Sequence, residues 1–189
     1  QVEAGEAAIA GAAIETGLLR LRGAVASARA AGELDLQARA LVRLGGALVH
    51  SARGTDEEGA AALHEGSALA EQLGENALAA TGWRETGWVQ FLRARYERAE
   101  ASLARAADLG RGHDEELAWV DAILGCCRSD VGHYAEAAER LRSAIDRSDR
   151  TNSVQAGAYG RAMLGRLYLL RGELDEARHM LDEALEFVQ

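Results

Sequence analysis

The sequence contains no lysine and no proline, and it has two cysteines among its 189 residues. All 21 basic residues are therefore arginine, and the 30 aspartates and glutamates outnumber them to give a net charge of −9. An acidic chain without a basic block attracts phosphate backbones poorly, so we expect no nucleic-acid partner. Because Cys126 and Cys127 are adjacent, the sequence offers neither a disulfide framework nor a cysteine-based metal site.

Long apolar runs are also absent. No stretch reaches the roughly 18 apolar residues of a membrane span, and the first residues lack the basic start and apolar core of a signal peptide. We therefore expect no membrane association and a cytoplasmic location. The chain is instead rich in strong helix formers, with 40 Ala and 25 Leu. Since no proline interrupts them, the composition predicts an all-α fold.

Glycines recur along the chain at nearly constant intervals, at Gly45, Gly87, Gly125 and Gly165. The last three are each followed by Ala at i+12, Leu at i+16 and Ala at i+19. These sets are Ala99, Leu103 and Ala106; Ala137, Leu141 and Ala144; and Ala177, Leu181 and Ala184. Side chains four and then three positions apart share one helix face. The pattern predicts helical hairpins in which a glycine of the first helix faces an alanine of the second, while the leucine fills the groove toward the next hairpin.

This pattern resembles the tetratricopeptide repeat, a helix–turn–helix unit of about 34 residues. The last repeat carries its signature in register, as Leu164-Gly165, Tyr168, Gly172, Ala177, Leu181 and Ala184. The resemblance implies an α-α superhelix, a solenoid of antiparallel hairpins that forms one repeat domain over residues 1–189. The predicted hairpins cover residues 35–74, 76–110, 114–148 and 153–188, after a degenerate hairpin at 3–31.

The first half of the chain fits the repeat less well. In the degenerate hairpin the glycine expected to face the second helix is Gly11, which precedes Gly45 by one repeat length. In the hairpin at 35–74 the turn at Ser51–Thr55 is lengthened, and Thr55 and Glu58 have the spacing of a capping box. The second helix of that hairpin has no unique register. In the second half, extra residues are expected at the junctions 110–114 and 147–153.

A second resemblance concerns the junctions between hairpins. Junctions such as Ala-Gly-Glu-Leu at 31–34 and Leu-Gly-Glu-Asn at 73–76 resemble the helical arrays of large bacterial regulators, in which an NTPase precedes the array and a LuxR-type DNA-binding domain follows it. This resemblance implies a scaffold or sensor within a signalling or transcriptional regulator. Because the chain begins and ends inside a helical pattern, we expect a fragment of a longer polypeptide. Its terminal helix, with Leu181, Leu185 and Val188, is expected to favour self-association.

Motifs for chemistry are missing. Gly45-Gly46 lies in a helical pattern without a following lysine, so it is no phosphate-binding loop. The five histidines include no pair at the i, i+4 spacing of a helical zinc site. His113 and the acidic residues 114–116 could attract a cation, but acidic residues in a first helical turn also suit the helix dipole. We predict no enzyme activity, no catalytic residue, no cofactor and no bound metal.

The tetratricopeptide resemblance also implies a binding surface, because the first helices of successive hairpins line the concave side in that family. The register places on it six residues: Arg84, Trp88, Phe91, Trp119, Tyr159 and Arg166. Arginine and aromatic residues are common at binding hot spots. Since these register positions hold arginine and no carboxylate, we expect a protein or peptide partner that is acidic to amphipathic, or another domain of the same polypeptide. Trp83 is expected to be core.

Other readings of these residues stay open at this point. The aromatic side chains could simply pack between neighbouring first helices, and the arginines could pair with neighbouring glutamates. The superhelix could enclose a small-molecule effector instead of a peptide. A purely structural role, as a spacer or self-association surface, is the remaining alternative.

Overall fold

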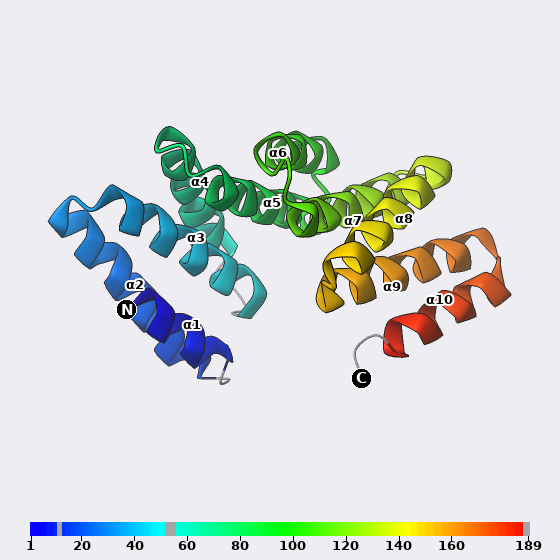
Figure 1. Ribbon diagram of the computed structural model, residues 1–189, viewed down its shortest axis with the longest axis horizontal. Coiled ribbons are helices and arrows are strands. Elements are labelled where there is room, and N and C mark those ends of the chain that lie inside the picture. The colour runs from blue at the N-terminus through cyan, green and yellow to red at the C-terminus, as the bar shows by residue number, and fades with distance from the viewer. Residues whose placement is uncertain (11–12, 52–55, 187–189) are drawn as a thin grey trace. The chain divides into compact units, whose positions relative to one another are not determined.

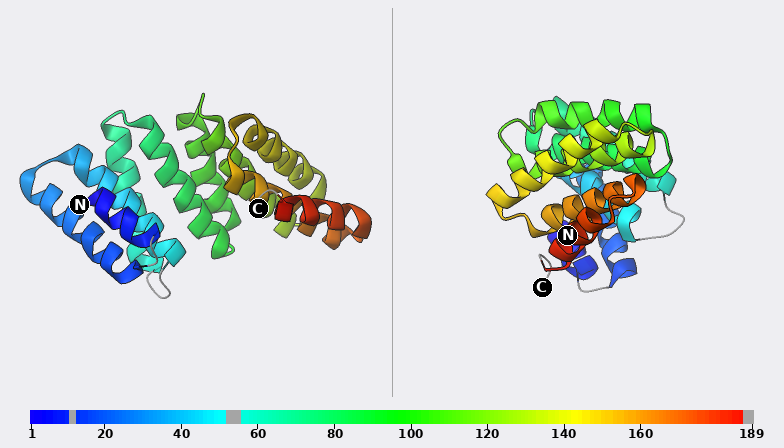
Figure 2. Two further views of the ribbon diagram at one scale, coloured as in Figure 1. Left: turned by 60° about the horizontal axis from the view of Figure 1, so that its bottom comes forward. Right: turned by 90° about the vertical axis from the view of Figure 1, so that its right-hand side faces the viewer.

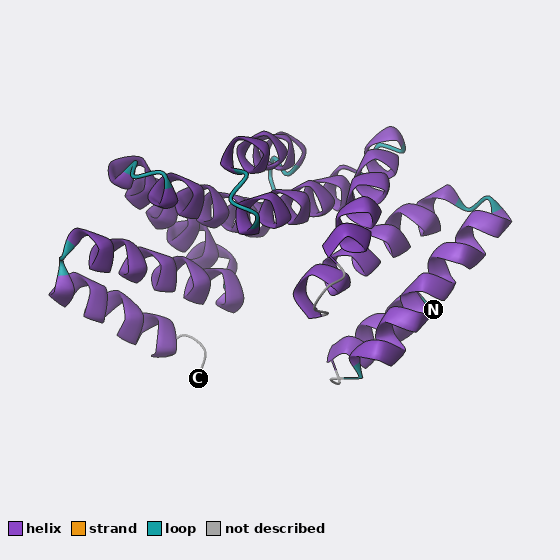
Figure 3. Cartoon of the chain, turned by 180° about the vertical axis from the view of Figure 1, so that it is seen from behind, coloured by secondary structure: helices purple, strands orange, loops and turns teal. Residues whose placement is uncertain are grey.

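The computed structural model describes residues 1–10, 13–51 and 56–186. All regular structure in these ranges is helical, with no strand, which confirms the all-α prediction (Figures 1 and 3). The helices are α1 (Val2–Ala10), α2 (Ile14–Ala31), α3 (Leu34–Ser51), α4 (Asp56–Gln72), α5 (Asn76–Leu92), α6 (Tyr96–Leu109), α7 (Asp114–Asp130), α8 (Tyr134–Thr151), α9 (Val154–Arg171) and α10 (Leu174–Glu186). Within the described ranges, no helix combines the length and the apolar character that crossing a membrane requires.

The chain forms two compact units, Gln1–Arg93 and Ala94–Gln189. In the first unit α1 packs on α2 and α3 packs on α4, and α5 contacts both α3 and α4. In the second unit α7 packs on α8 and α9 on α10, while α6 contacts α7. The first helices of successive hairpins also touch, as α1 with α3, α3 with α5, and α7 with α9 (Figure 2).

A glycine-to-leucine contact holds each of the last two hairpins together. A Cβ atom added at Gly125 of α7 would lie 2.6 Å from Leu141 Cγ and 3.2 Å from the Ala137 carbonyl oxygen of α8. Leu141 is fully buried. The predicted approach of glycine to alanine is therefore present, but the leucine fills the space beneath the glycine of its own hairpin. The expectation that it fills a groove toward the next hairpin is wrong, because the glycine's missing side chain leaves room for it.

The same contact gives the register of the first unit. A Cβ at Gly45 would lie 2.5 Å from Leu63 Cγ, and Leu63 stands at i+18 from this glycine in place of i+16. A Cβ at Gly5 would lie 2.8 Å from Leu21 Cγ, and Leu21 stands at the usual i+16. The degenerate hairpin is thus aligned on Gly5 and not on Gly11. Gly11, the turn at 52–55 and the proposed cap at Thr55 lie outside the described residues.

Left-handed residues end the helices at the turns. Gly132 and Gly172, with φ of 83° and 79°, close the two predicted turns of the second unit. Ala94 takes the same region at φ 53°, although a side chain makes it costly there. Asn152, also at φ 53°, caps α8, which continues through Thr151. Most of the stretch 147–153, expected to be a junction, is therefore helix.

Neighbouring glycines of α3 allow a direct test of the packing role. We expect Gly45→Ala to lower the free energy of unfolding by about 1–2 kcal/mol, because overpacking against Leu63 outweighs the gain in helix propensity. Gly46 has no described atom within 4 Å of an added Cβ. Gly46→Ala is therefore the matched control, and it should raise stability by up to about 1 kcal/mol.

Urea unfolding followed by circular dichroism measures both variants. Equal changes of the same sign would show that Gly45 does not act through the contact with Leu63.

Candidate functional site

Three of the predicted site residues gather in the first unit, on α5. Trp88 lies between Phe91, with ring centroids 5.6 Å apart, and His50 of α3, at 6.1 Å. Arg84 and Glu85 lie one turn earlier on α5 and complete what we call the first cluster. Because α3 and α5 are the first helices of successive hairpins, the cluster spans two repeats of the solenoid.

The charges of the first cluster are satisfied internally. Glu85 is 8% exposed. Its carboxylate accepts a hydrogen bond of 2.6 Å from Arg84 Nη1, and its other oxygen lies 2.7 Å from His50 Nε2. Burial pushes the pKa of Glu85 up, but the hydrogen bond with His50 and the charge of Arg84 outweigh it and hold the pKa below its usual range.

The other three predicted residues gather in the second unit. The rings of Trp119 on α7 and Tyr159 on α9 lie 5.5 Å apart, and the Tyr159 hydroxyl is 3.5 Å from Cys126 Sγ. Arg166 of α9 donates a hydrogen bond of 2.8 Å to Asp130 at the end of α7. These five residues form the second cluster, which again joins the first helices of successive hairpins.

The environment of the second cluster disfavours covalent chemistry. Burial raises the pKa of the Cys126 thiol to about 11, so the nucleophilic thiolate is scarce at neutral pH. Burial likewise raises the pKa of the Tyr159 phenol. The hydrogen bond to Asp130 raises the pKa of Arg166, whose positive charge is balanced by that carboxylate. What the cluster offers is aromatic surface beside a neutralised ion pair.

The structure corrects two expectations about these residues. The predicted surface does hold carboxylates, Glu85 and Asp130, each paired with the arginine expected to bind an acidic ligand. Trp83 is half-buried and not core, and its Nε1 donates a hydrogen bond of 3.1 Å to Glu71. Each trio of predicted residues lies within one unit, so a surface shared by all six stays a prediction.

Sequence reasoning missed His50, Glu85 and Asp130. His50 and Asp130 share a signal, since each lies five residues after the repeat glycine of its hairpin. From that position each reaches the next first helix, 35 residues on to Glu85 and 36 residues on to Arg166. A search for polar pairs at this separation would have found both.

The acidic start of α7 has a structural role. Asp114 accepts hydrogen bonds from Arg147 and Arg150 of α8, at 2.5 and 3.0 Å. The buried Asp121 accepts hydrogen bonds from Arg140, at 2.8 Å, and from Arg147, at 3.1 Å. Among the described residues no group of three His, Cys, Asp or Glu side chains is arranged to hold a metal ion. The acidic turn therefore ties α7 to α8.

Known proteins resemble this chain in structure and not detectably in sequence. No protein-family model matches the sequence, and no curated protein matches it. A crystal structure of Podosopora anserina putative kinesin light chain nearly identical TPR-like repeats superposes with a TM-score of 0.72 at 17% identity, covering 98% of this chain and 91% of that one. A crystal structure of MamA gives a TM-score of 0.62 at 18% identity, covering 97% and 93%. At these identities the likeness establishes the fold, which is a TPR-like helical repeat.

The lowered pKa of Glu85 gives a pH prediction. Its carboxylate adds stability above the ordinary pKa near 4.5, and this contribution disappears as the pH falls through the lower folded-state pKa. Glu85→Gln should cost about 1–3 kcal/mol at pH 7, because the ionic hydrogen bonds to Arg84 and His50 are lost. It should cost progressively less below pH 4.5.

Urea midpoints measured from pH 7 to pH 3 test this. Glu97→Gln on the exposed first turn of α6 is the control for removing one surface charge. A constant difference between Glu85→Gln and wild type across this range would contradict the assignment.

Proposed function

We propose that the chain is a non-catalytic scaffold that binds a protein or peptide partner through its two aromatic clusters. The observation that carries this proposal is the pairing of partly exposed aromatic rings across adjacent first helices, at Trp88 with Phe91 and His50, and at Trp119 with Tyr159. Aromatic side chains bring large contact area at low entropic cost. The TPR-like fold supports the proposal because it repeats such positions along a solenoid.

The chemistry of the clusters narrows the ligand to an amphipathic segment. Arg84 and Arg166 already balance Glu85 and Asp130, so each cluster has little net charge to offer an acidic peptide. Rings flanked by neutral ion pairs suit apolar side chains with a polar edge. This replaces the acidic ligand expected from the arginines alone.

We also propose that the scaffold belongs to a bacterial signalling or transcriptional regulator. The support is the pattern of the junctions at 31–34 and 73–76. The junctions are built as short turns, with Gly32 and Gly74 in the left-handed region at φ 70° and 75°. The same proposal includes a cytoplasmic location and contacts with further domains of the parent protein.

Self-association is a second candidate, favoured by α10. Leu174 and Leu185 of this helix are 66% and 61% exposed, more than an ordinary surface needs. Leu181, expected on the same face, packs beneath Gly165 instead. Val188 lies outside the described residues. Sedimentation of a Leu174→Ser, Leu185→Ser variant against wild type distinguishes this role, which requires the variant to dissociate.

Peptide selection tests the scaffold proposal. Peptides are selected from a phage-displayed random library on the immobilised protein, and their affinities are measured for variants. We expect Trp88→Ala or Trp119→Ala to weaken the selected peptides at least tenfold, or about 1.4 kcal/mol. Trp83→Ala, which removes a half-buried tryptophan outside both clusters, is the matched control and should leave binding unchanged.

Helical content is checked by circular dichroism for each variant. Selected peptides that bind both cluster variants as tightly as wild type would contradict the proposal.

A further inference from the structure

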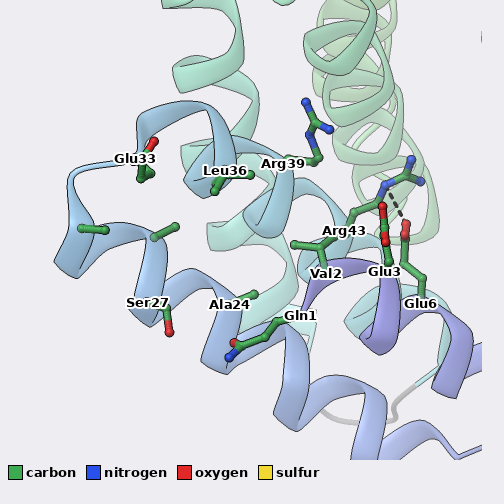
Figure 4. A pocket seen from close by; sticks show the side chains of 12 residues that line it. Gln1, Val2, Glu3, Glu6, Ala24, Ser27, Glu33, Leu36, Arg39 and Arg43 are labelled. Atoms are coloured by element: carbon green, nitrogen blue, oxygen red, sulfur yellow. Dashed lines mark ion pairs between the residues drawn. The ribbon is translucent and has the colours of Figure 1, made fainter.

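A groove on the first unit lies apart from both clusters. It has a volume of about 560 Å³ and is enclosed by α1, α2 and α3 (Figure 4). Its floor is made of small residues of α2, chiefly Ala24 and Ala28, and Leu36 and Arg39 of α3 form one wall. Val2 at the start of α1 closes one end. We call this the α2–α3 groove.

The repeat shows what covers the corresponding surface in another hairpin. Arg147 and Arg150 of α8 lie six and nine residues after the repeat leucine, the positions that Ser27 and Ala30 occupy on α2. Both arginines bind Asp114 in the first turn of α7. In the hairpin of α7 and α8, the first two turns of the first helix therefore lie over this part of the second helix.

Helix α1 does not reach over the groove. Gly5 is the fourth residue of α1, whereas Gly45, Gly125 and Gly165 are the twelfth residues of their helices. The difference of eight residues corresponds to about two helical turns, or roughly 12 Å. As a result, Leu36 on the groove wall is 47% exposed.

The residues that fill this position elsewhere define the ligand. Seven residues before each repeat glycine the chain has alanine: Ala38, Ala80, Ala118 and Ala158. Ala38 is fully buried, and three residues later Leu41 contacts Gly66, where a Cβ would lie 2.8 Å from Leu41 Cβ. Gly66 corresponds to Ala24 in the α2–α3 groove. A small residue followed by a leucine three positions on is thus the pattern that fits such a floor.

We propose that the α2–α3 groove binds two turns of a helix from a partner protein, seated in line with α1. A small side chain of the partner helix faces Ala28, and a leucine one turn later lies over Ala24. The wall at Leu36 contacts its apolar edge. The first turn of α1 presents backbone N–H groups toward the C-terminal carbonyls of the partner helix. This partner site is separate from the two clusters and does not depend on them.

Peptide binding tests this site. The probe is a side-chain-stapled, fluorescein-labelled peptide with the sequence of residues 34–42, stapled because short helices are marginal in water. Fluorescence anisotropy should show saturable binding to the wild-type chain. Ala28→Leu, which fills the floor, should weaken binding at least tenfold, and Leu36→Ala should weaken it several-fold.

Three controls accompany these changes. Leu19→Ala removes a leucine of α2 that is 70% exposed and does not line the groove, so it should leave the affinity unchanged. A probe peptide carrying Ala38→Trp should not bind. Trp119→Ala in the second unit should also leave binding unchanged, which keeps this test distinct from that of the clusters.

Three outcomes would overturn the proposal. The probe could fail to saturate at millimolar concentration, or it could bind the Ala28→Leu variant as well as wild type. A concentration-dependent dimer of wild type that Ala28→Leu abolishes would assign the groove to a second copy of the chain.

Discussion

The fold depends on one contact, a glycine of the first helix packed over a leucine of the second. At Gly125 and at Gly165 there is no space for a side chain, because Leu141 and Leu181 lie where a Cβ would need its van der Waals room. Two helices that approach this closely have little freedom to slide or rotate against each other. Each hairpin is therefore fixed in register by a pair of residues, and the rest of the helix surface is available for other contacts.

That register determines which side chains meet between hairpins. Within each unit the first helices touch, and residues about 35 positions apart come into contact, such as His50 with Glu85 and Asp130 with Arg166. The aromatic residues lie beside these ion pairs. Binding surface and charge pairing thus follow from the same repeat, since one spacing generates both.

Much of this arrangement could be predicted from the sequence. The repeated glycines, with Ala, Leu and Ala at i+12, i+16 and i+19, predicted the helices of the second unit, because the turns there have constant length. The first unit was harder. The connection after α3 adds two residues before Gly59 and Leu63, and two glycines, Gly5 and Gly11, competed for one position. Only the packing distances distinguish such alternatives.

The candidate site shows the same division. Periodicity placed Trp119 and Tyr159 on adjacent helices, and the structure brings their rings together. It could not place Glu85, because the burial of a carboxylate depends on the rotation of α5 against α3 and on partners from another repeat. Electrostatic pairing is set by three-dimensional proximity, which a one-dimensional spacing specifies incompletely.

A double-mutant cycle between Gly125 and Leu141 tests the central contact most directly. Unfolding free energies are measured for Gly125→Ala, for Leu141→Ala and for the double variant. If the leucine fills the space beneath the glycine, Gly125→Ala costs about 1–3 kcal/mol in wild type but becomes neutral or stabilising once Leu141 is alanine. Effects that simply add would contradict the account.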